Sequence, residues 1–249
     1  MCTAVILRRP DHRWPVLIGA NRDEMIDRPW KPPGRHWPDR PEVMAGLDVL
    51  AGGSWLGIND WGVAAAVLNR TGSLGPAPGR RSRGELVLEA LDHADAIAAA
   101  YALADLDPDS YRTFNLVVAD ERDAFWLRHA GGPRIEVRPL KEGLSMVAAG
   151  DVDDLGTRRL ELALPAFREW PAPEPDRDDW AAWQELLGST RAPPGEPATA
   201  AMRFRTDGYG TVSSALIALP ARNEPGRHAH FRFAGWQPQL TPWQNVGPG

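Results

Sequence analysis

Short apolar runs separated by turn residues fill the first part of the chain and constrain its fold more than any other feature. Two runs, 2–9 and 14–21, are rich in Val, Ile and Leu and are separated by the polar turn 10–13. This pattern predicts a β-hairpin, with Cys2 at the start of one strand and Asn21 at the end of the other. Cys2 is therefore expected to lie beside the tetrapeptide Asn-Arg-Asp-Glu that begins at Asn21.

Three more strands are predicted after a Pro-rich loop at 29–41, namely 43–49, 53–59 and 62–69. The pattern then becomes helical. Ser82 and Glu85 have the spacing of a capping box, and apolar residues recur at helical spacing from Leu86 to Tyr101. This predicts one or two helices that end before Pro108.

Strand and helix signals alternate through the rest of the chain. Strands are predicted at 114–120, 123–129, 134–140, 144–149, 212–219 and 228–234, and helices at 155–169 and 180–187. Pro165 is expected to kink or end the first of these two helices. Helices flanked by strands on both sides predict an α+β sandwich with antiparallel sheets, and we expect one domain over 1–249.

Composition excludes several classes of protein. Hydrophobic residues make up 43% of the chain and charged residues 24%, which is typical of a folded globular protein. A single cysteine excludes an internal disulfide framework, and the first apolar run is too short for a secretory signal, so a cytoplasmic location is expected. No apolar stretch approaches the roughly 20 residues of a membrane span. The net charge of −5 gives no electrostatic basis for binding nucleic acid.

The only cysteine, Cys2, follows the initiator methionine. Removal of Met1 would place a free α-amine, with a pKa of about 7.7–8.0, on the same residue as a thiol with a pKa of about 8.5. The amine could then act as the base for its own nucleophile. By residue type, Asp23 could orient the amine and Asn69 could stabilise an oxyanion. Taken alone, however, a lone cysteine is more typical of a small buried hydrophobe.

Three segments carry a resemblance to a known family. "GANRDEMIDRPWKP", "AGLDVLAGGSWLGINDWGVAAAVLNRTG" and "RSRGELV", together with the Met-Cys start, closely resemble the transport and Golgi organisation family, also called the NRDE family. The resemblance implies an N-terminal nucleophile hydrolase fold, a four-layer αββα sandwich similar to that of the choloylglycine hydrolases and penicillin V acylases. Those enzymes cleave linear amides through an N-terminal cysteine.

The resemblance assigns roles to individual residues. Cys2 matches the nucleophile, Asp23 the aspartate near the amine, and Asn69 the asparagine of the oxyanion hole. Asn21, Arg22 and Trp55 are the expected substrate-binding residues. Without the resemblance, the tetrapeptide reads as a polar strand end whose side chains bond to backbone, and the tryptophans read as packing residues.

Three positions depart from the pattern of the relatives. Ala20 stands where the acylases carry an arginine, with Arg22 between Asn21 and Asp23 instead. Gly150 or Asp151 falls near the place of a second oxyanion asparagine, and Val212 stands where the family carries an arginine.

Two functions follow from this resemblance. The first is hydrolysis or acyl transfer at linear amide (C–N) bonds through Cys2, with no cofactor required. The alternative is a non-catalytic protein that binds and carries haem or a lipid or acyl-CoA. In either case the expected partner is a small molecule, and the oligomeric state is left open. His228 and His230 lack an evident third ligand, so no metal site is predicted.

Overall fold

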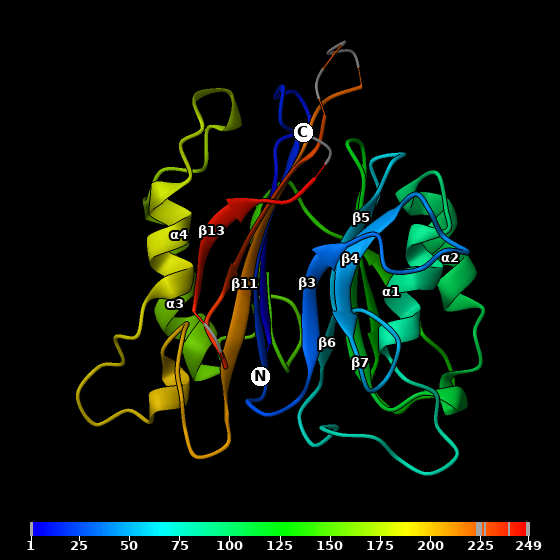
Figure 1. Cartoon of the computed structure of the whole chain (residues 1–249), viewed down its shortest axis with the longest axis horizontal. Coiled ribbons are helices and arrows are strands. Elements are labelled where there is room, and N and C mark those ends of the chain that lie inside the picture. Colours follow the sequence, from blue (N-terminus) through cyan, green and yellow to red (C-terminus); the bar gives the residue numbers. More distant parts are fainter. Residues whose placement is uncertain (1, 223–225, 227, 239, 248–249) are drawn as a thin grey trace.

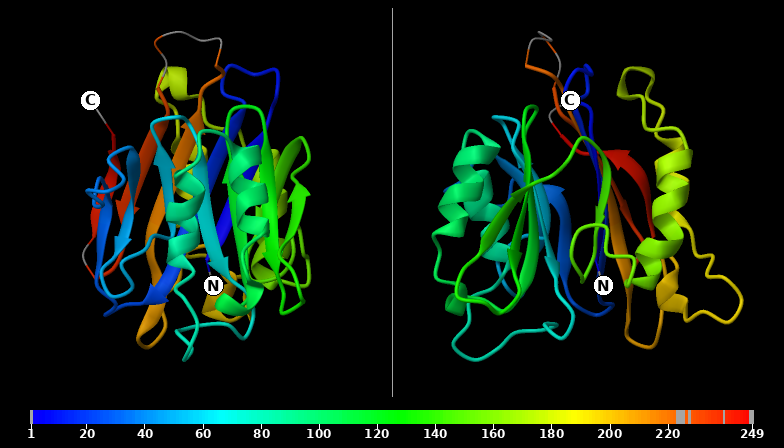
Figure 2. Two further views of the ribbon diagram at one scale, coloured as in Figure 1. Left: turned by 90° about the vertical axis from the view of Figure 1, so that its right-hand side faces the viewer. Right: turned by 180° about the vertical axis from the view of Figure 1, so that it is seen from behind.

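Two antiparallel β-sheets pack face to face, and a pair of helices covers the outer face of each sheet (Figure 1). The structure is a computed structural model that describes residues 2–222, 226, 228–238 and 240–247. Figure 2 shows α1 and α2 on one side of the molecule and α3 and α4 on the other. The predicted four-layer αββα architecture is confirmed.

The first sheet contains the predicted hairpin. Its strand order is β10-β1-β2-β11-β12-β13. The strands are β1 (Thr3–Arg8), β2 (Val16–Met25), β10 (Gly143–Val147), β11 (Tyr209–Leu219), β12 (His230–Gly235) and β13 (Thr241–Asn245). Helices α3 (Arg158–Glu169) and α4 (Ala181–Gly188) pack on its outer face through Leu160, Phe167 and Trp183.

The second sheet is built from the middle of the chain, in the order β3-β4-β5-β6-β7-β8-β9. Its strands are β3 (Trp30–Gly34), β4 (Val43–Asp48), β5 (Leu56–Asn59), β6 (Ala64–Asn69), β7 (Phe114–Ala119), β8 (Ala124–His129) and β9 (Glu136–Pro139). Helices α1 (Gly84–Leu91) and α2 (Ala96–Ala104) cover its outer face. None of the helices in the described part of the chain is long and apolar enough to cross a membrane.

Apolar side chains of both inner faces form the core between the sheets. Ile6 and Ile18 from the first sheet belong to the same cluster as Leu56 and Trp126 from the second. Cys2 packs against the edge of this cluster and is partly buried. The nucleophile candidate therefore lies where the space between the two sheets opens.

The hairpin brings Cys2 and the tetrapeptide together as predicted. Thr3 pairs with Asn21 across β1 and β2. Strand β2 is longer than predicted, however, because it continues through the tetrapeptide to Met25 and pairs with β11 along its whole length. Successive side chains of a strand point to opposite faces, so the four polar residues are divided between two environments.

Prolines account for two strands that the sequence pattern missed. β3 contains Pro32 and Pro33 within the predicted loop, and β13 contains Pro242. Both are edge strands, where a residue without a backbone N–H is tolerated.

Two helix predictions need correction. Ser82 and Glu85 do not form a capping box: Arg83 is the N-cap, the Ser82 hydroxyl accepts from Gly84 N, and Glu85 pairs with Arg81. Helix α3 begins at Arg158, later than expected, and continues past Pro165 to Glu169.

Candidate functional site

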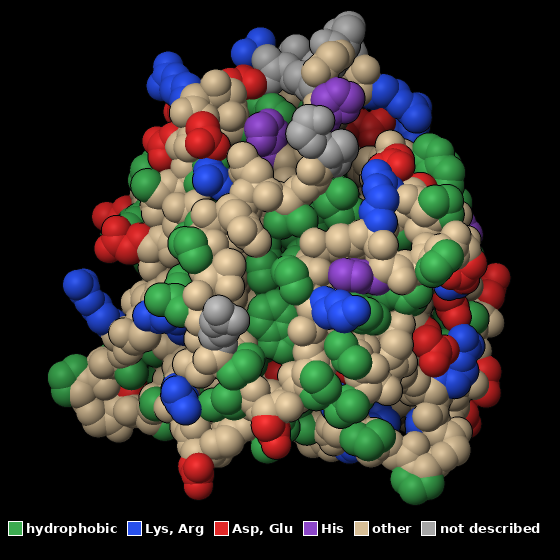
Figure 3. Space-filling model, viewed as in Figure 1, with side chains coloured by type: hydrophobic (Ala, Val, Ile, Leu, Met, Phe, Trp, Pro, Cys, Tyr) green, Lys and Arg blue, Asp and Glu red, His purple; other side chains and the backbone are tan. Residues whose placement is uncertain are grey.

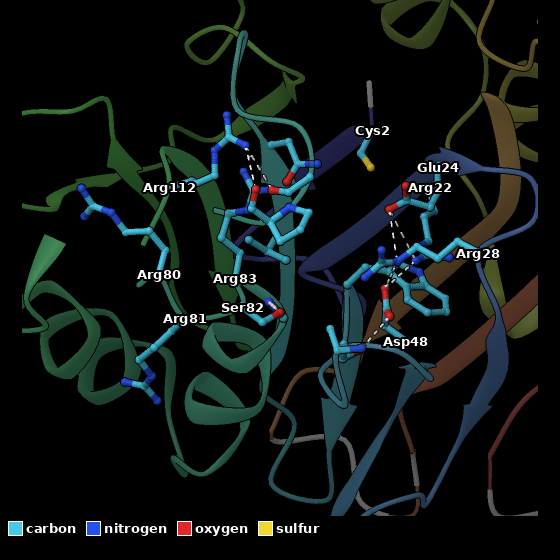
Figure 4. A pocket seen from close by; sticks show the side chains of 18 of the residues that line it. Cys2, Arg22, Glu24, Arg28, Asp48, Arg80, Arg81, Ser82, Arg83 and Arg112 are labelled. Atoms are coloured by element: carbon cyan, nitrogen blue, oxygen red, sulfur yellow. Dashed lines mark hydrogen bonds and ion pairs between the residues drawn. The ribbon is translucent and has the colours of Figure 1, made fainter. Parts of the chain in front are cut away.

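A cavity of about 280 Å³ opens beside Cys2, at the end of the sandwich where β1 begins (Figure 4). Its walls come from β2, from the segment that leads into β5, from the end of β6 and from the loop that precedes α1. Of the six predicted site residues, Cys2, Arg22, Trp55 and Asn69 line this cavity.

The Cys2 thiol contacts the backbone of Asp23 on the paired strand. Asp23 N–H donates to Cys2 Sγ at 3.4 Å, and the thiol in turn faces the Asp23 carbonyl oxygen at 3.6 Å. The Tyr209 hydroxyl donates to the same carbonyl at 3.1 Å. Burial, and then the charge of Asp23, raise the pKa of the Cys2 thiol above its usual value. The thiol is therefore protonated at neutral pH and needs a nearby base to become a nucleophile.

The Asp23 side chain lies on the outer face of β2, beneath α3. Its carboxylate accepts from Arg159 Nη1 at 2.7 Å and from Thr211 Oγ1 at 2.8 Å. The side chains of Asp23 and Arg159 are 0% and 3% exposed, so this ion pair is buried. Arg159 also donates to Thr3 Oγ1 at 3.0 Å, next to Cys2 in the chain. The pair fixes the carboxylate and both strands of the hairpin relative to α3.

Asn21 lies on the same outer face and is fully engaged by the protein. Its Nδ2 donates to the carbonyl oxygens of Leu187 and Met202 at 2.9 and 2.8 Å. Its Oδ1 accepts from the Ser214 hydroxyl at 2.5 Å. The structure thus places the Asn21 amide in a buried network that ties β2 to the end of α4.

Arg22 points inward, into the Cys2 cavity. Its guanidinium carbon lies 4.2 Å from the ring centre of Trp55, and Nη2 donates to Asp48 Oδ2 at 3.0 Å. Arg28 donates to the same oxygen at 2.7 Å. Arg22 is only 4% exposed, and its Nη1 atom is buried with no hydrogen-bond partner among the described residues.

Asn69 is the last residue of β6 and reaches the cavity from the second sheet. It is half-buried, and its side-chain amide makes no hydrogen bond within the described part of the chain. The backbone pairing of Asn69 with Phe114 fixes its position. An amide held by its backbone and free at its side chain can donate to an oxygen of a bound molecule.

The three departures from the pattern of the relatives lie in distinct surroundings. Ala20 belongs to the core between the sheets. A Cβ at Gly150 would lie 2.1 Å from Asp154 Oδ2, so a side chain at this position would displace the Asp154 carboxylate. Asp151 pairs with Arg70 and is absent from the described lining of the Cys2 cavity, and Val212 is buried at a bulge in β11.

The sequence pattern did not predict the three residues that contact Asp23. Arg159, Tyr209 and Thr211 contact Asp23 from positions 136 to 188 residues further along the chain. The sequence signals were an arginine at the start of an amphipathic helix and the "YGT" segment, and neither indicates a contact with Asp23.

The two histidines near the C-terminal end lie apart from this site. The rings of His230 and Trp14 are 5.0 Å apart, and His228 lines a different cavity beside Trp61. Within the described ranges, no group of three or more His, Cys, Asp or Glu residues could hold a metal ion.

Known structures share the fold and define its class. An N-acylethanolamine-hydrolyzing acid amidase ortholog from Caenorhabditis elegans superposes with a TM-score of 0.59 at 14% identity, covering 87% of this chain and 92% of the amidase. Penicillin V acylase from Agrobacterium tumefaciens gives a TM-score of 0.58 at 15% identity, covering 98% and 86%. A variant of conjugated bile acid hydrolase from Clostridium perfringens gives 0.54 at 12% identity, covering 98% and 92%. The fold is that of the N-terminal nucleophile hydrolases.

Sequence comparison identifies the family. The chain belongs to the Transport and Golgi organisation 2 family, whose profile matches residues 1–224. The mouse (Mus musculus) Transport and Golgi organization 2 homolog is 36% identical over 111 residues, which cover 42% of this chain and 38% of the mouse protein. The Bos taurus homolog is 37% identical over 111 residues, which also cover 42% of this chain and 38% of that protein. The matched segment thus spans less than two fifths of these relatives.

Proposed function

We propose that this protein hydrolyses linear amides, or transfers their acyl groups, through Cys2. The observation that carries the proposal is the cavity itself, in which the Cys2 thiol and the unbonded Asn69 amide line one space. A nucleophile and an oxyanion donor in one cavity are what acyl transfer requires. The fold shared with amide-cleaving enzymes supports the same reaction class.

The reaction begins with removal of the thiol proton by the α-amine of Cys2. Sγ attacks the amide carbon, and the oxygen of the tetrahedral intermediate accepts a hydrogen bond from Asn69. The C–N bond then breaks, and the amine leaves with the proton returned by the α-amine. Water or another acceptor attacks the resulting thioester and regenerates the thiol. The Asp23–Arg159 ion pair fixes the position of Asp23, whose backbone N–H donates to Cys2 Sγ.

The free amine requires removal of Met1, which lies outside the described residues. Intact-mass spectrometry of protein from its native host tests this step. We expect the mass of the chain without its first methionine. A fully retained Met1 would block the amine and contradict the proposed base.

The nucleophile is tested with an acylating electrophile such as a β-lactone that carries an acylamino substituent. Because Cys2 is the only cysteine, a single thioester adduct can be assigned to it without ambiguity. We expect one adduct on the wild-type protein and none on Cys2→Ala. Fluorogenic N-acyl aminocoumarins then measure turnover, which Cys2→Ser should abolish. Turnover that is unchanged in Cys2→Ser would overturn the proposal.

A second candidate, a carrier of haem or of a lipid or acyl-CoA, draws support from an apolar groove of about 840 Å³. Met25, Trp30 and Phe233 line it, and Figure 3 shows apolar side chains in the hollow between β3 and β13. A carrier would bind its ligand equally well in wild-type and Cys2→Ser protein, and Phe233→Ala would weaken that binding. Tight haem or acyl-CoA binding without any turnover would favour this candidate.

A further inference from the structure

We infer that the Cys2 cavity binds an anionic group, a carboxylate or a phosphate, close to the scissile amide of the substrate. The inference rests on the proposed function and adds the chemical class of the substrate. Three observations support it: the charge of the cavity wall, the partners of its arginines, and the buried nitrogen of Arg22.

The wall of the cavity is strongly basic although the protein is acidic. Among the described residues, six arginines and two carboxylates line the cavity, whereas the whole chain carries a net charge of −5. The arginines are Arg22, Arg28, Arg80, Arg81, Arg83 and Arg112, and the carboxylates are Glu24 and Asp48. A concave surface of one sign concentrates ions of the opposite sign.

Two of these arginines are neutralised away from the cavity. Arg81 pairs with Glu85 and Glu89, and Arg80 pairs with Asp109. In Figure 4 both guanidinium groups point away from Cys2. They contribute little to a ligand beside the thiol.

Arg83 and Arg112 have no carboxylate partner among the described residues. Arg83 donates to the carbonyl oxygens of Ser73 and Thr113, and Arg112 donates to those of Gly72 and Leu74. Burial, and then the nearby charge of Arg112, lower the pKa of Arg83 to about 10. Two like charges are thus held together by loop carbonyls, and Glu24 acts on Arg83 only as a nearby charge without forming an ion pair with it.

Arg22 supplies a donor that the protein leaves unused. Nη2 is bonded to Asp48, while Nη1 is buried without a partner in the described structure. A charged donor that is buried and unpaired destabilises the protein until a partner satisfies it. A carboxylate or phosphate oxygen would satisfy it with a charge-assisted hydrogen bond, the geometry for which a guanidinium is suited.

The placement of these groups sets where the anion lies. Figure 4 shows Arg22 with Asp48 on one side of the cavity, and Arg83 and Arg112 across from them, with Cys2 between. Cys2 and these arginines line one and the same cavity of about 280 Å³. The anion therefore belongs to the part of the substrate next to the scissile bond, as in an N-acyl amino acid.

The test compares three ligands that share one acyl chain: N-lauroylglycine, N-lauroyl phosphoethanolamine and the uncharged N-lauroylethanolamine. Calorimetric binding to Cys2→Ala protein avoids turnover. We expect one or both anions to bind about tenfold to a hundredfold more tightly than the neutral amide, with the preference falling at high salt. The stronger of the two anions identifies the charged group. Equal affinity for all three ligands would overturn the inference.

Substitutions locate the preference within the cavity. Arg22→Met and Arg112→Gln should each reduce the anion preference several-fold, and Arg22→Lys should restore part of it. Arg81→Gln is the control, an arginine of the same cavity lining whose charge is paired with Glu85 and Glu89, and it should leave the preference unchanged. A preference that falls equally in Arg81→Gln, or persists in Arg22→Met and Arg112→Gln, would contradict this site. Binding is measured without catalysis, so failure of the amide-cleavage assay is a separate result.

Discussion

The polar side chains on the two faces of one short segment of β2 differ in how many of their atoms have hydrogen-bond partners within the protein. On the outer face, Asn21 makes three hydrogen bonds and Asp23 is held by Arg159 and Thr211. On the inner face, Arg22 has a buried nitrogen with no partner in the described structure. Polar groups that the protein satisfies itself build the site, whereas a group left unsatisfied is available to a ligand.

The largest expected effect comes from breaking the buried ion pair of the outer face. Arg159→Met removes the arginine from a buried ion pair with Asp23, which should lower the free energy of unfolding by about 3–5 kcal/mol. Urea denaturation measures the change. Arg158→Met is the control on the same helix, because its exposed pairs with Glu161 and Glu196 contribute at most about 1 kcal/mol. Equal losses in both variants would contradict the assignment.

A smaller loss is expected when the amide of the outer face is replaced. Asn21→Leu leaves the buried carbonyl oxygens of Leu187 and Met202 without their donor, at a cost of about 1–3 kcal/mol. Asn69→Leu is the matched comparison, since that amide bonds to nothing in the described chain, and we expect less than about 1 kcal/mol. Amide turnover should respond in the opposite order if Asn69 is the oxyanion donor. The same stability loss in both variants would remove the distinction between the faces.

The inner face should tolerate loss of its cation better. Arg22→Met removes the stacking on Trp55 but also the unsatisfied nitrogen, and Arg28 continues to bond Asp48. We expect the free energy of unfolding to change by about 1 kcal/mol, well below the loss in Arg159→Met. Chemical denaturation of the two variants side by side gives the comparison. A larger loss in Arg22→Met would make Arg22 a structural residue.

The smallest effect concerns pH. Burial raises the pKa of the Cys2 thiol, so the folded state retains its proton above pH about 8.5, where the unfolded thiol ionises. Stability contributed by this group is therefore fully present below that pH and is lost as the pH rises toward the folded pKa. The slope is at most about 1.4 kcal/mol per pH unit. Urea midpoints between neutral pH and mildly alkaline pH should fall more steeply for wild-type protein than for Cys2→Ser, and parallel slopes would refute the shift.

Local sequence patterns predicted most of the fold because most strands alternate or run apolar over several residues. They missed β3 and β13, where prolines at sheet edges resemble loop signals. They also ended β2 too early, because four consecutive polar residues look like a strand end when the cavity and the helix layer on either side are unknown. Strand β2 is central in its sheet, and both of its faces are covered.

Part of the candidate site was predicted from the hairpin pattern and from the family resemblance. The hairpin and the resemblance led to Cys2, Arg22, Trp55 and Asn69, which line one cavity. The partners of Asp23 could not be found this way, because Arg159 and Thr211 reach it only through tertiary packing. Likewise, Arg83 comes from a loop rich in glycine and proline and Arg112 from the short segment before β7, and neither sequence indicates what it faces.

The bulge in β11 affects the number of residues between two hydroxyl groups that lie on the same face of the sheet. Thr211 and Ser214 are an odd number of residues apart, yet both bond to outer-face residues of β2, Thr211 to Asp23 and Ser214 to Asn21. This is consistent only because Val212 is an extra residue that β2 does not match. Deleting Val212 would restore a regular ladder in which Thr211 and Ser214 are two positions apart, so both hydroxyls would keep the outer face. The contacts of Asn21 and Asp23 with these hydroxyls therefore depend on how β11 is paired with β2, and the extra residue changes only the number of residues between them.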